Sequence, residues 1–232
     1  MSSTKVPVSL IVPCKNEEAN IERCLNSVPW VAEAFIVDSQ STDQTAKIAT
    51  DIGANVVQFK YEGGWPKKKN WALENLPFEN EWVLILDADE CLPPEAEEEI
   101  RAIVEDQNEP NAGYWINRRY FFMGQALKHA YFPNWNLRLF KHRLGRYEKI
   151  IEGDTDSGDH EIHEHVVVEG STGKMRVIMD HHAFPTIESF VEKHNRYSNW
   201  EAIVESTSKD EAGSLQHKGV KGKRLLRRIF RK

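Results

Sequence analysis

The sequence predicts an α/β fold in which a mixed, mainly parallel sheet is flanked by helices within a single domain. Short apolar runs alternate with helical patterns across residues 6–92, starting and ending with a strand. Parallel strands need crossover connections, which helices supply with right-handed geometry. Several of the apolar runs also lead into polar or acidic residues, and the carboxyl ends of parallel strands share one edge of a sheet. These observations place a ligand site at that edge.

Four apolar runs predict the strands of this sheet, at residues 6–12, 34–37, 56–59 and 82–86. Pro13 is expected to break the first strand, because proline has no N–H for a ladder. The second strand ends on Asp38. The fourth is almost wholly apolar, as is typical of a buried parallel strand.

Three helices are expected between these strands. Asn16 is suited to cap the first, and Ser41 or Thr42 the second, because short polar side chains bond the free N–H groups of a first turn. The third is expected to start around Lys67 and Lys68, which we predict to be solvated rather than in contact with a ligand.

The fourth strand runs directly into Asp87, Ala88 and Asp89. If the chain stays extended there, the two aspartates project to the same side. Two carboxylates suit a hard cation such as Mg²⁺, which takes one or two of them together with substrate phosphates. An idle, solvated acidic turn is the other interpretation, but three strand ends that converge on one edge favour a site.

Composition excludes several classes of protein. The chain has 232 residues, 40% hydrophobic and 28% charged, which is ordinary for a globular protein. No apolar stretch approaches the length that spans a bilayer. Three cysteines without metal-ligand spacing indicate a reducing compartment, so we expect a cytoplasmic protein. The net charge of −6 becomes −14 without the eight basic residues after position 217, and such an acidic body does not suit nucleic acid.

Four ordered segments carry a specific resemblance. They read VSLIVPCKNEEANIERCLNSV, FIVDSQSTDQTAKIA, KKKNWAL and WVLILDADE. They resemble the inverting family 2 glycosyltransferases of the GT-A fold, which implies that fold and transfer of a sugar. Later segments, including NLRLFK and EIHEHV, are similar to a bacterial branch that adds glucose to the inner core of lipopolysaccharide.

The resemblance also implies roles for residues. Asp89 looks like the metal-binding acid of the family's D-x-D motif, with Mg²⁺ or Mn²⁺ as the cation, and His181 resembles a histidine that reaches the metal or the diphosphate. The residues expected to bind the nucleotide donor are Pro13, Glu17, Asp38, Lys69, Asn70, Asp87 and Ala88. A metal and a nearby lysine neutralise the charge that develops on a diphosphate leaving group.

Inversion needs a base for the acceptor hydroxyl. Residues 152–164 offer several acids, and we select Glu164 because it precedes an apolar run at residues 166–168 and matches a His-Glu element of the resembling branch. The neighbouring histidines raise a rival hypothesis of a zinc hydrolase, but no zinc-binding spacing is present. Arg138 lies among aromatic residues that we expect to be mostly core, and it is a candidate contact for an acceptor phosphate.

The C-terminal region predicts a helix over residues 186–206 that packs on the sheet, then a polar break over residues 206–213. We assign residues 1–212 to the transferase domain and residues 213–232 to a basic amphipathic tail, a type that lies on anionic membrane surfaces. A disordered charged tail is the alternative. The tail would place the protein on the cytoplasmic face of the inner membrane.

The predicted activity is metal-dependent transfer, with inversion, of one sugar from a nucleotide-diphosphate sugar, with UDP favoured, to a cell-envelope glycan or glycolipid. Two alternatives remain. A nucleotidyltransferase can use a similar sheet and metal, although its first loop is ordinarily rich in glycine and basic residues, unlike PCKNEE. A non-catalytic module that binds saccharide is the other.

Overall fold

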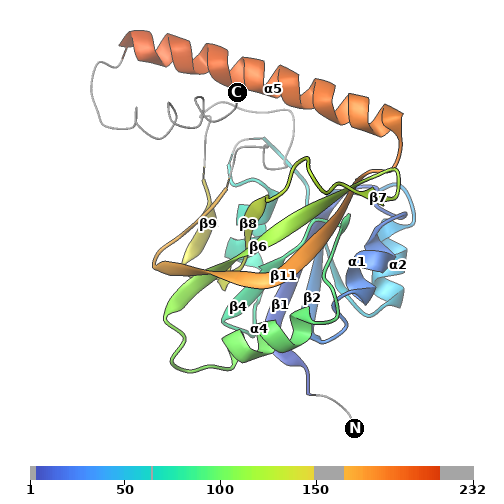
Figure 1. The fold of residues 1–232 in the computed structure, drawn as a ribbon, viewed down its shortest axis with the longest axis vertical. Coiled ribbons are helices and arrows are strands. Elements are labelled where there is room, and N and C mark those ends of the chain that lie inside the picture. Colours follow the sequence, from blue (N-terminus) through green and yellow to red (C-terminus); the bar gives the residue numbers. More distant parts are fainter. Residues whose placement is uncertain (1–3, 64, 149–164, 215–232) are drawn as a thin grey trace. The chain divides into compact units, whose positions relative to one another are not determined.

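The computed structural model describes residues 4–63, 65–148 and 165–214. A nine-stranded sheet runs in the order β3-β2-β1-β4-β8-β6-β11-β5, with β7 paired to β6, and β9 pairs separately with β10 (Figure 1). The strands are β1 (Val6–Cys14), β2 (Val31–Asp38), β3 (Asn55–Gln58), β4 (Trp82–Ile85), β5 (Glu90–Cys91), β6 (Asn111–Phe122), β7 (Gln125–Ala126), β8 (Trp135–Lys141), β9 (Gly145–Tyr147), β10 (Val166–Val168) and β11 (Ser171–Phe184). The helices are α1 (Ile21–Asn26), α2 (Thr45–Asp51), α3 (Lys68–Asn75), α4 (Ala96–Val104) and α5 (Ile187–Ser214).

The predicted order of strands and helices is confirmed through β4. Strands β3, β2, β1 and β4 are parallel neighbours, whereas β8 joins β4 and β6 in antiparallel pairing. Strand β1 continues through Pro13 to Cys14, so the predicted break is wrong. Pairing with β4 ends at Ile11, and Pro13 lies opposite Val37 of β2, so its missing N–H costs no bond on the β4 side.

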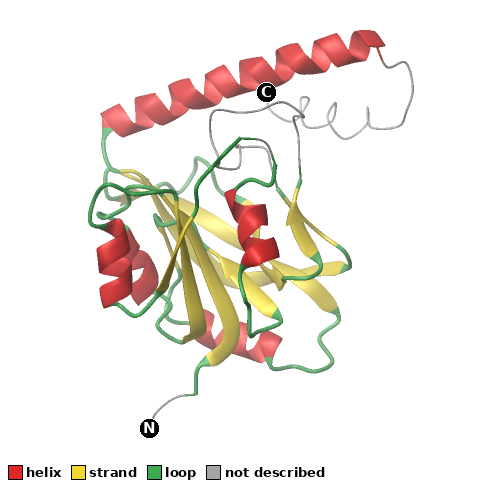
Figure 2. Ribbon diagram, turned by 180° about the vertical axis from the view of Figure 1, so that it is seen from behind, coloured by secondary structure: helices red, strands yellow, loops and turns green. Residues whose placement is uncertain are grey.

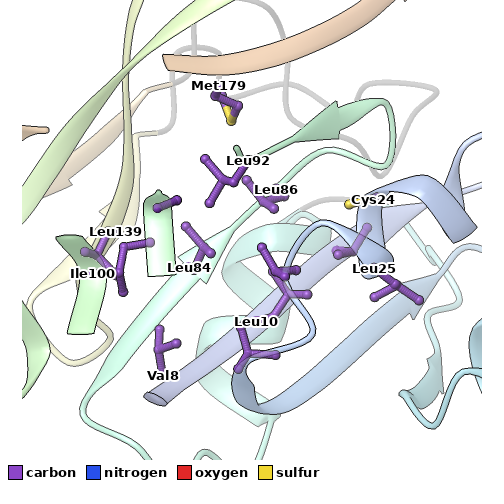
Figure 3. Packing of buried hydrophobic residues seen from close by; sticks show 14 of the residues in the cluster. Val8, Leu10, Cys24, Leu25, Leu84, Leu86, Leu92, Ile100, Leu139 and Met179 are labelled. Carbon is purple, nitrogen blue, oxygen red and sulfur yellow. The ribbon is translucent and has the colours of Figure 1, made fainter. Parts of the chain in front are cut away.

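Helices cover both faces of the sheet, as the views from the two sides show (Figure 2). Side chains alternate along a strand, so Leu10 of β1 packs in one core cluster and Ile11 in the other. The first cluster lies under α1 and α4 and includes Leu25 and Ile100 (Figure 3). The second lies under α3, with Leu73 as a member. The strands that carry the candidate site are therefore fixed from both sides.

The predicted helix caps are wrong. Helices α1 and α2 have no side-chain cap bond. Asn16, in a left-handed conformation with φ 55°, instead accepts a bond from the Thr42 N–H at 2.8 Å, and its own N–H donates to Ser41 Oγ at 2.8 Å. The polar side chains tie the loop after β1 to the loop after β2, a long-range use that short-range capping rules do not reveal.

The C-terminal helix is longer than predicted. The chain divides into one compact unit over Met1–Phe190 and a second over Val191–Lys232. Helix α5 continues through residues 206–213, where Lys209, Glu211 and Ala212 favour helix, so the predicted polar break is wrong. Its first turn packs through Phe190, whose ring lies 5.0 Å from that of Phe184. Packing of the rest of α5 on the sheet stays a prediction, and tail residues 215–232 lie outside the described residues.

Candidate active site

The carboxyl ends of β1 and β2 meet at one edge of the sheet, where Cys14 and Asp38 are register partners. Asp38 is 1% exposed and accepts bonds from the Ser41 N–H at 3.1 Å and from Gln58 Nε2 at 2.9 Å. Burial raises the pKa of the Cys14 thiol to about 12, and Asp38 reinforces the shift. The thiol therefore stays protonated, with Sγ 3.9 Å from Asp38 Oδ1. The bonds from Ser41 and Gln58 hold Asp38, for which the resemblance implies a contact with the nucleoside, in a fixed position.

A network of buried charges follows β4. Glu90 is fully buried and pairs with Arg138 at 2.5 Å and with Arg118 at 3.0 Å. Arg138 also contacts Asp87 at 2.6 Å, and Lys69 contacts the other oxygen of Asp87 at 2.9 Å. Within the part of the chain that the structure describes, three cations contact these two carboxylates, which leaves the network one positive charge in excess. Such an excess suits an anionic ligand.

Titration of Asp87 is set by these partners. Burial acts to raise the pKa of the Asp87 carboxyl, but Arg138 and Lys69 outweigh burial and hold that pKa well below its usual range. Burial acts to lower the pKa of Lys69, and Asp87 more than offsets it, so the pKa of Lys69 is raised. Both groups are therefore ionised at neutral pH.

The depressed pKa of Asp87 predicts acid sensitivity. A carboxylate whose folded-state pKa lies below its unfolded-state value stabilises the fold above the unfolded value of about 3.9, and this contribution is lost as pH falls toward the folded-state pKa. We expect the urea concentration at the unfolding midpoint of the native protein to decrease as the pH is lowered below about 4. In Asp87→Asn this midpoint should decrease less steeply over the same pH range. The exposed Asp51, which pairs with Lys47, supplies the control Asp51→Asn. If the urea midpoint of Asp87→Asn depended on pH as steeply as that of the native protein, Asp87 would not be the source of the acid sensitivity.

The chain turns at Ala88 and Asp89 instead of staying extended, and Glu90 N–H closes the turn on the Asp87 carbonyl at 2.9 Å. The expectation that both aspartates project to one side assumed an extended chain from Asp87 to Asp89, and that assumption is wrong. Asp89 Oδ2 lies 3.1 Å from His181 Nε2 of β11. The His182 N–H also donates to the Asp89 carbonyl at 2.8 Å. Asp89 and His181 thus form a second pair, two residues beyond Asp87.

The Asp89–His181 pair fits a divalent cation. Adjacent ligands of an octahedral Mg²⁺ lie about 3 Å apart, since each is about 2.1 Å from the ion. The 3.1 Å separation is that of a direct hydrogen bond and is also compatible with two adjacent ligands of one ion, and the oxygen and imidazole donors suit Mn²⁺. His181 Nδ1 is buried without a hydrogen-bond partner. No cluster of three metal-ligating side chains occurs within the described ranges, so a cation here would complete its shell with ligand oxygens or water.

The lysines and the asparagine of α3 mostly serve the fold. Lys67 is 5% exposed and Lys68 is 2% exposed, so the prediction that they are solvated is wrong. Lys68 Nζ donates to the Cys14 carbonyl at 3.1 Å, a long-range bond that compensates burial of the ammonium. Asn70 exchanges two bonds of 2.9 Å with the backbone of Tyr147 and so fixes α3 to β9. Lys69 is the member of this segment that reaches the Asp87 network.

The other predicted site residues are spread around the same edge. Pro13 is half-buried in β1, and Ala88 is buried in the turn. The Glu17 carboxylate accepts a bond from Asn20 Nδ2 at 2.8 Å. Arg138 is occupied by Asp87 and Glu90, and its role as an acceptor contact stays a prediction. Glu164 lies outside the described residues.

Sequence reasoning missed Glu90 and Arg118. Glu90 immediately follows the D-A-D triplet, and this third acid is the sequence feature that could have marked it as a site residue. Its two arginine partners lie on β6 and β8, far along the chain, so no local spacing reveals the pairing. The prediction that most of the aromatic residues of this region are core is confirmed only in part, since Tyr114 and Trp115 are half-buried and pack against the two core clusters. Phe140 is fully buried, but Tyr131 and Phe132 are 45% and 38% exposed.

Comparison with known proteins places this site in a family. Residues 9–159 match the family model described as glycosyl transferase family 2. The chain is 32% identical over 204 residues to an uncharacterized glycosyltransferase of Rickettsia typhi, covering 84% of this chain and 66% of that protein. It is 32% identical over 208 residues to the lipopolysaccharide core biosynthesis glycosyltransferase LpsC of Rhizobium meliloti, covering 85% of this chain and 71% of that protein.

The chain therefore belongs to glycosyl transferase family 2. Family membership, together with the mixed sheet and its flanking helices, confirms the predicted GT-A fold class. The chain spans 66% and 71% of the lengths of these two relatives. Among solved structures it is similar to S. aureus TarS, with 24% identity and a TM-score of 0.45 over 58% of this chain and 47% of that one.

Proposed function

We propose that the chain is an inverting glycosyltransferase that moves one sugar from a UDP-sugar to a hydroxyl of a glycan or glycolipid acceptor. The observation that carries the proposal is the Asp89–His181 pair, at 3.1 Å, beside the ionised Asp87 and Lys69 at the carboxyl edge of the parallel strands. Ligands of open α/β sheets bind at this edge. The arrangement offers a cation site and a lysine where a diphosphate needs both.

In this proposal Asp89 and His181 would hold Mg²⁺ or Mn²⁺, and the ion, when bound, would neutralise charge on the diphosphate leaving group. Asp38 and Glu17 orient the nucleoside, with Pro13, Ala88 and Asn70 shaping its surroundings. Lys69 holds a positive charge near the phosphates, and Asp87 keeps that ammonium in position through their 2.9 Å pair. Preorganised charge of this kind favours the transition state, in which charge develops on the leaving oxygen.

The acceptor hydroxyl attacks the anomeric carbon on the face opposite the leaving diphosphate, and Glu164 accepts its proton as the new bond forms. A single displacement inverts the anomeric centre. The experiment is to supply UDP-glucose, whose glucosyl linkage is α, and to follow the anomeric proton of the product by NMR. A β-linked product supports the proposal, whereas an α-linked product contradicts it.

Glu164 is expected to be indispensable for turnover. Glu164→Gln keeps the shape of the side chain but removes the base, and general bases contribute roughly 100-fold or more to rate. We expect UDP release from UDP-glucose in the presence of a lipopolysaccharide core oligosaccharide to slow by at least about 100-fold, with UDP binding unchanged. Exposed Glu169 supplies the control Glu169→Gln. A loss under tenfold would assign the base elsewhere.

The acceptor class rests on similarity to LpsC, whose name refers to biosynthesis of the lipopolysaccharide core. On that basis we extend the proposal to an acceptor of lipopolysaccharide core type, glycosylated at the cytoplasmic face of the membrane. None of the helices in the described ranges is both long enough and apolar enough to cross a membrane. Contact with the membrane would then fall to the basic tail at residues 213–232.

Binding of the tail to membranes is testable by charge removal. We expect the full chain to float with vesicles that contain anionic lipid, and the double variant Arg227→Ala and Arg228→Ala to lose most of that binding. Each basic residue near an anionic surface contributes about 1 kcal/mol, so two removals reduce affinity about 30-fold. Neutral vesicles are the control. Equal flotation of the native protein and the double variant would contradict membrane binding through these arginines.

A further inference from the structure

An exposed aromatic pair lies close to the candidate active site. Tyr131 and Phe132, in the loop between β7 and β8, are 45% and 38% exposed. They are the aromatic members of the set of exposed large apolar side chains within the ranges that the structure describes. Scattered exposed aliphatic residues are ordinary, but adjacent exposed rings more often mark a binding surface.

Tyr131 is held in a defined position. Its ring centroid lies 5.1 Å from that of Tyr120 and 6.3 Å from that of Phe184. Its backbone has φ 59°, a conformation that bulky side chains rarely adopt. Such backbone conformations are costly and persist only where surrounding contacts hold them in place, and they are concentrated at ligand sites. The ring is therefore preorganised while still partly open to solvent.

Ring contacts connect Tyr131 to the proposed cation ligands. Tyr120 lies between Tyr131 and His181, with its ring centroid 4.7 Å from the imidazole, and His181 contacts Asp89 at 3.1 Å. Arg118 covers the Tyr120 ring with its guanidinium 4.8 Å from the centroid. Two ring contacts, through Tyr120, therefore link a molecule that stacks on Tyr131 to the proposed cation ligand His181.

The charge of this loop is one-sided. Residues 123–133 contain Lys128 and His129, both exposed, and no acidic residue, although the chain as a whole has a net charge of −6. Sugar rings present apolar C–H faces to aromatic side chains, and an ammonium or imidazolium attracts phosphate or carboxylate. Aromatic and basic groups together suit a sugar that carries an anionic substituent.

We propose that Tyr131 and Phe132 form the acceptor subsite, on which one pyranose ring of an anionic glycan stacks while Lys128 and His129 hold its phosphate or carboxylate. This inference rests on the proposed transferase function and specifies the substrate class of the same site. A membrane surface is the competing occupant. The ring contacts that lead to Asp89 favour the glycan, because a membrane anchor has no need to touch the reaction centre.

The test compares variants of Tyr131 that keep or remove the ring. Tyr131→Asn removes it while tolerating positive φ, and Tyr131→Phe retains it. Ile52→Asn is the matched control, since Ile52 is 40% exposed at the C-terminal end of α2, the end opposite the carboxyl edge of the strands. Binding of glucose 6-phosphate and of methyl glucoside is measured by saturation-transfer NMR, with UDP and Mg²⁺ at saturating concentration.

We expect glucose 6-phosphate to bind the native protein more tightly than methyl glucoside, and Tyr131→Asn to weaken it at least tenfold. Tyr131→Phe and Ile52→Asn should stay within twofold of native. Equal binding in Tyr131→Asn, or no binding to the native protein, overturns the subsite. Loss of binding to anionic vesicles in Tyr131→Asn, with sugar binding intact, overturns it in favour of the membrane. Failure of UDP to bind in the same samples counts against the proposed function alone, because binding of glucose 6-phosphate to the native protein and to the variants is measured from separate signals.

Discussion

Replacing Arg138 with leucine is expected to lower the free energy of unfolding by about 3 kcal/mol. Arg138 is 5% exposed and pairs with Asp87 and with the fully buried Glu90. Removing one partner of a buried ion pair leaves a charge without compensation, which typically costs about 3–5 kcal/mol. The lower value is expected here because Arg118 and Lys69 keep contact with the two carboxylates. Urea denaturation of the two proteins at pH 7 measures the difference.

A surface arginine supplies the control. Arg101 pairs with Glu97 and Glu105 along α4, and such solvent-screened pairs contribute little to stability. Arg138→Leu should therefore cost clearly more than Arg101→Leu. Adding Glu90→Gln to Arg138→Leu should recover part of the loss, because the buried carboxylate charge is then removed as well. Equal costs for the two single variants would mean that the network does not stabilise the fold.

Asp89→Ala is expected to slow UDP release from UDP-glucose by about 1000-fold, since neutralisation of a leaving group by a metal is worth several kcal/mol. The variant removes one proposed cation ligand and the partner of His181 Nε2. The fold should persist, because the His182 N–H bonds the backbone carbonyl of residue 89, which alanine retains. Exposed Asp51 supplies the control Asp51→Ala. A rate within tenfold of native, at unchanged thermal stability, would remove Asp89 from catalysis.

The sequence predicted the strand and helix order well because that order depends on local patterns. The apolar runs that end at Asp38 and Asp87 are buried strands, and parallel pairing brings their ends to one edge. Asp89 and His181, both selected from the resemblance, lie 3.1 Å apart in the structure. Patterns of hydrophobicity decide which segments enter a sheet, so the strands are predictable without coordinates, whereas the role of His181 came from the resemblance alone.

Long-range pairing was not predictable in the same way. The buried Lys68 ammonium donates a hydrogen bond to a backbone carbonyl 54 residues away, and nothing in the run of three lysines signals that acceptor. Glu90 pairs with arginines of two other strands. The Asn16 side chain accepts a hydrogen bond from the loop after β2 instead of from the first turn of a helix. Propensity rules describe neighbours in sequence, whereas these side chains are fixed by neighbours in space.

The central claim is that Asp89 and His181 hold the cation that receives the nucleotide diphosphate. Calorimetric titration of UDP into the native protein, with and without Mn²⁺, and into Asp89→Ala and His181→Gln tests it most directly. We expect UDP to bind the native protein only with the metal, Asp89→Ala to lose this binding and His181→Gln to weaken it at least tenfold. UDP binding of equal strength with and without Mn²⁺, or native affinity in Asp89→Ala, would contradict it.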